Sequence, residues 1–345
     1  MTGRTRAVRN RPKGKGGPPG PTEVVPCPLC EGVRNRTVAV KFGLRIARCR
    51  GCGLVFANPR LVRPEFEKRY ESPEFIAEYL EAHRANPGGY DLEFLRGHHR
   101  LYLDWIKDRL FAGARLLDVG CGAGFFLKAA EADGWTAEGT EISRRLAAYA
   151  RDIVGVKVLL GTLPELALPE RAFDVVTLFD VLEHVPDPLR TLEEAARLLR
   201  PDGVVLISTP DYDSLSRLFL GTPWAVLSPA EHLSLFTERT LRGLVERAGL
   251  SVLAAGNRLV FNPDYTHKKG LRYRLWKRAH GRLARGRLAA RLRARETRGL
   301  PDEVTDARAG GRPAGILKKA RAALQSRLRT RLRGDILVAL ARKKS

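Results

Sequence analysis

LLDVGCGAGFFL, residues 116–127, joins an apolar run to three glycines at alternate positions. The apolar run is typical of a buried strand, and the FFLKAAEADG segment that follows is typical of a helix ending at Gly134. A glycine-rich turn between a strand and a helix brings the backbone close to a ligand, because glycine has no Cβ. The stretch therefore predicts a nucleotide site beyond the carboxyl end of the strand.

Strand-like and helix-like runs alternate from residue 115 onward. The strand-like runs are RLLDVG at 115–120, TAEGTEIS at 136–143, KVLLGT at 157–162, FDVVTLF at 173–179, VVLISTP at 204–210, SVLAAGNRLVF at 251–261 and GDILVALARKK at 334–344. Among the helical runs, PLRTLEEAARLLRPDG at 188–203 predicts a helix that is stopped by its Pro-Asp-Gly end. This alternation predicts an α/β fold with a mostly parallel sheet.

The glycine spacing separates two classes of nucleotide site. A dinucleotide fingerprint would need its third glycine at Phe125, whereas the chain has it at Gly124. Four motifs then follow in order: LLDVGCGAGF at 116–125, GTEIS at 139–143, FDVVTLFDVLEHVPDP at 173–188 and LLRPDGVVLISTP at 198–210. Together they resemble the class I S-adenosylmethionine-dependent methyltransferases, over about 113–262 and again over 335–342. The resemblance implies a Rossmann-like sheet whose last strand is antiparallel.

The resemblance also implies a role for each residue of the cofactor site. Asp118 is the acid that anchors the methionine end of the cofactor, and Glu141 accepts hydrogen bonds from its ribose. Ile142 lies beside the adenine. The backbone approaches the cofactor at three glycines, namely Gly120, Gly122 and Gly124.

Two further positions complete the implied cofactor site. Thr162 and Leu163 stand at the third adenine-contacting position, where Thr162 replaces the commoner acid and leaves the adenine contact open. Asp180 follows the fourth strand, at the mouth of the methyl-transfer site.

Methyl transfer needs an aligned acceptor and, for oxygen or carbon nucleophiles, a base. His232 is the first candidate for that base, and His184 with its neighbour Glu183 comes second. A purely structural role for either histidine is the competing interpretation.

Four of the five cysteines form CPLC (Cys27, Cys30) and CRGC (Cys49, Cys52), with 18 residues between the pairs. Two Cys-x2-Cys pairs at this spacing predict a closed tetrahedral zinc site with a structural role. Iron in a rubredoxin-like site is the competing interpretation. The fifth, Cys121, is expected to be a buried thiol. The cysteine module and the 223–250 tract also resemble a subgroup of these methyltransferases. Its members are often encoded among the genes of sugar, polyketide or cell-surface glycan pathways.

The net charge of +23 sits in two appendages. Residues 1–20 carry six Lys/Arg and no acidic residue, and 264–345 carry 25 Lys/Arg against six Asp/Glu, which leaves the middle near −2. The basic, leucine-striped stretch 268–333 suits an anionic membrane surface, with packing on a second subunit and RNA as alternatives. No secretory signal or membrane-spanning run is evident, so we expect a cytoplasmic protein, in membrane contact through that stretch.

These observations predict six segments: a disordered basic tail (1–22), a zinc-ribbon-like module (23–62), a helical linker (63–112), the methyltransferase core (113–262), a basic helical insertion (263–333) and a last strand with its tail (334–345). The expected function is methylation of oxygen or carbon in a small molecule, sugar, lipid or glycan precursor. RNA methylation and a non-catalytic binding role on a degenerate fold are the alternatives. The acceptor and the oligomeric state carry no readable signal.

Overall fold

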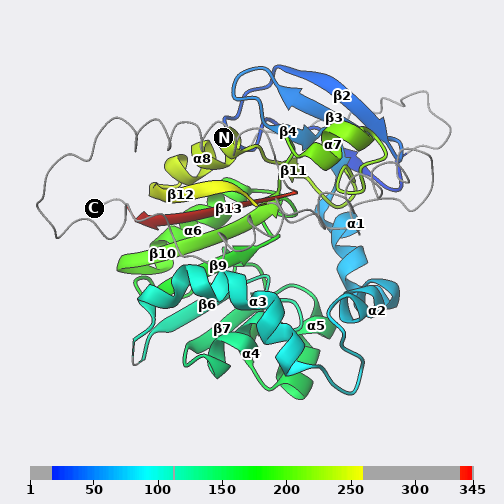
Figure 1. Cartoon of the computed structure of the whole chain (residues 1–345). Coiled ribbons are helices and arrows are strands. Elements are labelled where there is room, and N and C mark those ends of the chain that lie inside the picture. Colours follow the sequence, from blue (N-terminus) through cyan, green and yellow to red (C-terminus); the bar gives the residue numbers. More distant parts are fainter. Residues whose placement is uncertain (1–17, 112, 259–334, 344–345) are drawn as a thin grey trace, which may run out of the picture. The chain divides into compact units, whose positions relative to one another are not determined.

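The computed structural model describes residues 18–111, 113–258 and 335–343 (Figure 1). By internal contacts the chain divides into two units. The first comprises Met1–Tyr212, Val226–Asn257 and Ile336–Ser345, and the second Asp213–Ala225 and Arg258–Asp335. The cysteine module, the linker helices and the central sheet all fall within the first unit. The basic tail and the insertion predicted for 1–22 and 263–333 lie mostly outside the described residues, as does the proposed membrane-contacting stretch.

A seven-stranded sheet forms the centre of the first unit, in the order β12-β13-β10-β9-β6-β7-β8. Its strands are β6 Arg115–Val119, β7 Thr136–Glu141, β8 Lys157–Leu160, β9 Phe173–Phe179, β10 Leu199–Pro210, β12 Leu250–Arg258 and β13 Ile336–Lys343. The pairs from β8 through β10 are parallel, and β13 runs antiparallel to β10. Figure 1 shows β13 (red) between β12 and β10. The predicted α/β fold with an antiparallel last strand is confirmed.

Alternation along the strands builds one apolar core on each face of the sheet. Leu117 and Val119 of β6 pack with α6 (Pro188–Leu198) and α8 (Glu238–Arg247). Their neighbour Leu116 packs on the other face. The helices there are α3 (Leu92–Ile106), α4 (Phe125–Ala132) and α5 (Arg144–Tyr149), and α5 continues as a π-helical turn over Ala150–Val154.

The helix predicted to stop at Pro-Asp-Gly ends earlier. Helix α6 ends at Leu198, and Leu199 already belongs to β10, so the Pro-Asp-Gly residues lie inside that strand. The pairing of β10 with β9 shifts its register between Leu199 and Val204, which accommodates the extra residues as an irregularity. The prediction that the helix extends to Pro-Asp-Gly is therefore wrong. These residues are unfavourable in a helix, but they do not determine where the next strand begins.

The cysteine module is a small antiparallel sheet whose fourth strand comes from a distant part of the chain. Its own strands are β2 Asn35–Lys41, β3 Leu44–Cys49 and β4 Val55–Ala57, and the two-residue strand β11, Ser234–Leu235, joins at the β4 edge. A separate ladder pairs β1 (Thr22–Glu23) with β5 (Arg60–Leu61). The module is therefore completed by residues from the far end of the methyltransferase-like segment.

The linker supplies α1 (Arg63–Glu67), a 3-10 turn at Lys68–Glu71, α2 (Pro73–Ala82), α3 and a second 3-10 turn at Lys107–Arg109. Helices α2 and α3 begin at side-chain caps, where Ser72 accepts from the Phe75 amide and Asp91 from the Phe94 amide. Within the described residues, no helix has the length and apolar character needed to cross a membrane. The second unit holds α7, Leu215–Leu220.

Candidate active site

The glycine turn lies between β6 and α4, as predicted. Gly122 and Gly124 both have left-handed φ angles, 54° and 75°, which L side chains rarely adopt. A Cβ on Gly124 would also approach Val156 Cγ2 to 2.5 Å, whereas a Cβ on Gly122 would meet the hydroxyl of Tyr79 at 2.2 Å. Gly124 thus permits close packing of α4, and Gly122 leaves room for a polar group above the turn.

Glu141 ends β7 beside this turn and is 6% exposed. Its carboxylate accepts hydrogen bonds from the amides of Gly122, Ile142 and Ser143, each at 2.8 Å. Asp118, at the end of β6, is equally buried and accepts from Thr177 Oγ1 at 2.6 Å. Two buried carboxylates therefore flank the turn, and the parallel sheet places both at its carboxyl edge.

Helix α2 covers the turn through Tyr79. The Tyr79 hydroxyl lies directly over Gly122, and the phenol ring stacks on His83 with centroids 4.5 Å apart. The ring is also near-parallel to Phe125, at 6.3 Å and 14°, and Phe125 in turn contacts His83. A linker residue without any sequence motif thus contributes to the wall of the predicted cofactor site.

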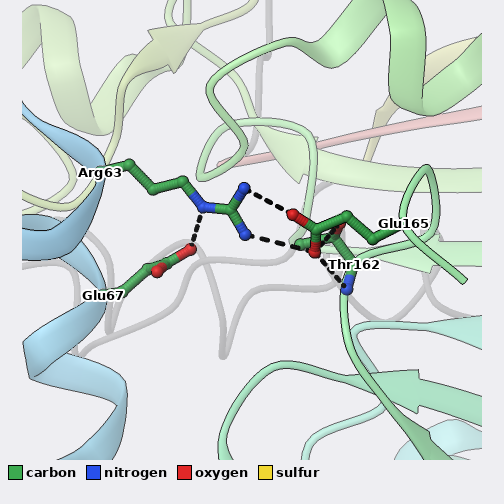
Figure 2. A network of polar contacts seen from close by, with 4 residues as sticks. All are labelled: Arg63, Glu67, Thr162 and Glu165. Carbon is green, nitrogen blue, oxygen red and sulfur yellow. Dashed lines mark hydrogen bonds and ion pairs between the residues drawn. The ribbon is translucent and has the colours of Figure 1, made fainter.

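A side chain of helix α1 binds the predicted adenine-contacting loop. Figure 2 shows Arg63 of α1 reaching Glu165, which in turn meets Thr162. Arg63 donates to both Glu165 oxygens, at 2.7 and 3.3 Å, and Thr162 Oγ1 donates to Glu165 Oε2 at 2.6 Å. The Thr162 hydroxyl is thus engaged within its own loop. Leu163 is 3% exposed and packs in the core that contains α6 and α8.

The three candidate catalytic residues lie together, although His232 is far from the other two in the chain. The His184 and His232 ring centroids are 4.6 Å apart, and His184 Nε2 is 4.0 Å from Glu183 Oε1. One nitrogen from each ring and a Glu183 oxygen lie within 4.8 Å of one another, a spacing that could also hold a cation. Asp180 adds a fourth polar group: its carboxylate accepts from Ser208 Oγ at 3.3 Å, and its charge helps to raise the pKa of Glu183.

Hydrogen bonds fix the orientation of both imidazoles. His232 Nδ1 lies 2.6 Å from the Val226 carbonyl, which can only accept, so Nδ1 carries the proton and the neutral ring presents Nε2 as its basic nitrogen. His184 Nδ1 lies 3.0 Å from the Tyr70 hydroxyl and 2.9 Å from the Glu231 carbonyl. Glu183 Oε2 accepts from Thr209 Oγ1 at 2.9 Å, while its buried Oε1 has no hydrogen-bond partner among the described residues.

Comparison with known proteins places this site in a family. A family model described as a methyltransferase domain matches residues 93–255. A ubiquinone biosynthesis O-methyltransferase from Aromatoleum aromaticum is 33% identical over 191 residues, 53% of this chain and 74% of that protein.

This chain belongs to the class I S-adenosylmethionine-dependent methyltransferases.

Other comparisons are more partial. A protein of the same name from Thiobacillus denitrificans is 35% identical over 151 residues, and the match spans 41% of this methyltransferase and 65% of the relative. A solved methyltransferase from Archaeoglobus fulgidus is 17% identical with a TM-score of 0.48, and the match covers 78% of this chain and all of that one.

Burial dominates the electrostatics of the methyltransferase site. It raises the pKa of Asp118 to about 7 against the lowering effect of the Thr177 hydrogen bond, and it also raises the pKa of Glu141. Burial lowers the pKa of His232 to about 4 and of His184 to about 3, so both rings are neutral at pH 7. Burial, with the nearby charge of Asp180, raises the pKa of Glu183 well above its usual range.

Sequence reasoning missed several groups around the methyltransferase's histidines. Tyr70 bonds to His184, and Arg69 Nε lies 3.4 Å from the Glu231 carboxylate. Burial lowers the pKa of Lys41, which lies in the hairpin of the cysteine module, although the charge of Glu231 partly opposes this shift. The only signal for Glu231 was its position next to His232, whereas Lys41, Arg69 and Tyr70 come from segments that carry no motif.

The cysteine geometry fits a tetrahedral metal. The Sγ atoms of Cys27 and Cys52 are 3.5 Å apart, as are those of Cys30 and Cys49, and all four lie within 4.8 Å of one another. Four sulfurs at this mutual spacing surround one point, as thiolates around zinc do. Cys121 is 6% exposed, and burial raises its pKa, as expected for an inert thiol.

Proposed function

We propose that this methyltransferase transfers a methyl group to an oxygen atom of a hydroxyl-bearing small molecule, with sugar, lipid and glycan precursors as the acceptor classes to test. The observation that carries the proposal is the oriented imidazole pair of His184 and His232 beside a buried carboxylate. Such a cluster is suited to remove a hydroxyl proton, which methylation of oxygen requires. The names of the curated relatives support oxygen as the acceptor atom, and carbon is the alternative.

The cofactor site fits S-adenosylmethionine by its donor set. When bound, the cofactor supplies a sulfonium-activated methyl group with a good leaving group. Glu141 and Asp118 would hold its hydroxyl and ammonium groups, because two buried carboxylates need donors to offset their lost hydration. The glycine turn gives the close backbone approach, and Tyr79 closes the site from α2.

His232 is the proposed base. Its Nε2 has a free lone pair because the Val226 carbonyl fixes the proton on Nδ1. Its low pKa keeps that lone pair available at neutral pH, although it also makes the base weak. The Glu183 carboxyl group lies beside this histidine pair, and its ionised form would offset the positive charge that forms when His232 accepts the proton.

For the cysteine module we propose a structural zinc ion held by Cys27, Cys30, Cys49 and Cys52. Four thiolates leave no open coordination position, so the metal would stabilise the fold of the module and take no part in bond breaking. Metal analysis of the purified protein distinguishes zinc from the iron alternative.

Transfer of radiolabelled methyl from S-adenosylmethionine to a panel of phenols, catechols and nucleotide-linked sugars tests the proposed activity. His232→Ala should abolish transfer while the affinity for S-adenosylhomocysteine stays unchanged. His98→Ala, at an exposed position of α3, is the matched control and should behave as wild type. Full transfer by His232→Ala would remove this histidine as the base.

A further inference from the structure

The cysteine module is joined to the active site by a shared strand. Strand β11 pairs with β4 of the module, Ser234 opposite Phe56 and Leu235 opposite Val55. The ladder extends one residue further, because the Ala57 amide donates to the Leu233 carbonyl at 3.0 Å. Leu233 directly follows His232, so the backbone that carries the proposed base is hydrogen-bonded to the module.

The metal-ligating cysteines hold the other end of that strand pair. Cys49 ends β3, and its amide donates to the Leu54 carbonyl at 2.9 Å, immediately before β4 begins. Cys52 lies three residues before β4, and its carbonyl accepts from the Arg239 guanidinium at the start of α8. Both cysteines of the second pair therefore fix the position of β4.

Strand β11 also contacts the loop that carries the other catalytic candidates. The Ser234 amide donates to the Glu183 carbonyl at 3.1 Å. Leu233 is 3% exposed and packs with Leu44 of the module and with Phe66 of α1, in a cluster that Tyr70 covers. One short strand thus joins the metal-held sheet, the Glu183–His184 loop and His232.

The cofactor site is held by different contacts. The carboxylates of Asp118 and Glu141 are bonded by groups of the central sheet and its loops, namely Thr177, Gly122, Ile142 and Ser143. These groups are fixed by the parallel ladders of β6, β7 and β9. Loosening the module would therefore leave the contacts of these two carboxylates in place.

We propose that the cysteine module is a positioning element of the active site: metal binding fixes β4, β4 fixes β11, and β11 orients His232 against His184 and Glu183. Metal occupancy then controls proton removal from the acceptor and leaves cofactor binding unchanged. The inference rests on the proposed zinc site and base. It goes beyond them because the metal would govern a step in which it takes no chemical part.

The test compares full-length protein as purified, after removal of the metal by chelation, and after zinc is added back. Three readouts need no acceptor: the affinity for S-adenosylhomocysteine by calorimetry, hydrogen exchange of residues 231–236, and the rate of His232 modification by diethyl pyrocarbonate, with exposed His98 as the internal reference. We expect unchanged affinity, and about tenfold faster exchange and modification without metal, reversed by zinc, as for a local opening. Exchange and modification that do not respond to metal would overturn the inference.

Two substitutions at one position provide a second test with the metal in place. Ser234→Pro removes the amide that bonds to the Glu183 carbonyl, whereas Ser234→Ala keeps the amide and removes only a hydroxyl without a hydrogen-bond partner among the described residues. Ser234→Pro should bind zinc and S-adenosylhomocysteine as wild type does but show faster His232 modification, and Ser234→Ala should match wild type. Identical modification rates in the two variants would contradict the role of β11. Wild-type protein that binds no S-adenosylhomocysteine would instead refute the proposed function, and wild-type protein that binds no zinc would refute the proposed metal site.

Discussion

Replacing Glu141 with glutamine probes the cofactor site most sharply, since it changes charge and keeps shape. The carboxylate accepts three backbone amides at 2.8 Å, two on Oε1 and one on Oε2. A glutamine carbonyl can keep only one of these oxygen positions, so its NH2 group must face an amide donor. The variant also loses the negative charge that would bind the ribose hydroxyls.

We expect Glu141→Gln to lose much of its affinity for S-adenosylhomocysteine and to change little in its free energy of unfolding. A hydrogen bond to a charged group contributes about 1.5–3 kcal/mol, so losing the charge should weaken S-adenosylhomocysteine binding by roughly 100-fold. For stability, an unpaired Gly122 amide costs free energy, whereas neutralising a buried carboxylate relieves its desolvation. These effects oppose each other, and we expect the unfolding free energy to change by less than about 2 kcal/mol.

Calorimetry with S-adenosylhomocysteine and thermal unfolding measure the two quantities. Glu138→Gln is the matched control: it lies on the same strand but pairs with Arg115 and Lys157, away from the glycine turn. It should bind S-adenosylhomocysteine as wild type does. Binding by Glu141→Gln within about threefold of wild type, less than 0.7 kcal/mol, would refute the assignment of Glu141 to the cofactor.

Three further predictions concern the Tyr79 wall of the cofactor site, the Arg63 contact to the predicted adenine-contacting loop, and the buried His99 of α3. Tyr79→Phe should weaken S-adenosylhomocysteine binding about tenfold in calorimetry, the contribution of one hydrogen bond; tighter binding would mean that the hydroxyl obstructs the site. Arg63→Ala should lower the unfolding free energy by less than about 1 kcal/mol in urea titrations, since the Arg63–Glu165 pair is half-exposed; a larger loss would make this contact a main support of α1. Burial lowers the pKa of His99 to about 3, below its unfolded value near 6.5, so its contribution to stability is complete above pH 6.5 and is lost as the pH falls toward 3, by about 1.4 kcal/mol per pH unit. His99→Phe should flatten the acid limb of stability measured by denaturation between pH 6.5 and 4, and an unchanged limb would contradict the buried, neutral state.

The sequence was sufficient for the features that depend on local pattern. Strand–glycine–helix periodicity located the turn, and the spacing of Glu141 placed a carboxylate beside it. The cysteine spacing predicted four sulfurs around one point. Each of these depends on residues within one or two adjacent elements, where geometry follows from chain direction.

Contacts between distant segments could not be read in the same way. The Tyr70–His184 bond joins residues 114 apart, and β11 joins a module whose other strands precede it by more than 170 positions. A two-residue strand such as Ser234–Leu235 has no periodicity to detect. The contacts of the Thr162 hydroxyl could not be predicted either, because its partner Glu165 is bound by Arg63 of the distant helix α1.

The most direct test of the whole account is a calorimetric titration of wild-type, metal-loaded protein with S-adenosylhomocysteine, with NAD titrated under the same conditions. The glycine turn and its two buried carboxylates predict binding of S-adenosylhomocysteine in the micromolar range, about −8 kcal/mol, and none of NAD. Folded protein that binds NAD, or that fails to bind S-adenosylhomocysteine, would contradict the assignment of this turn to a methyl donor.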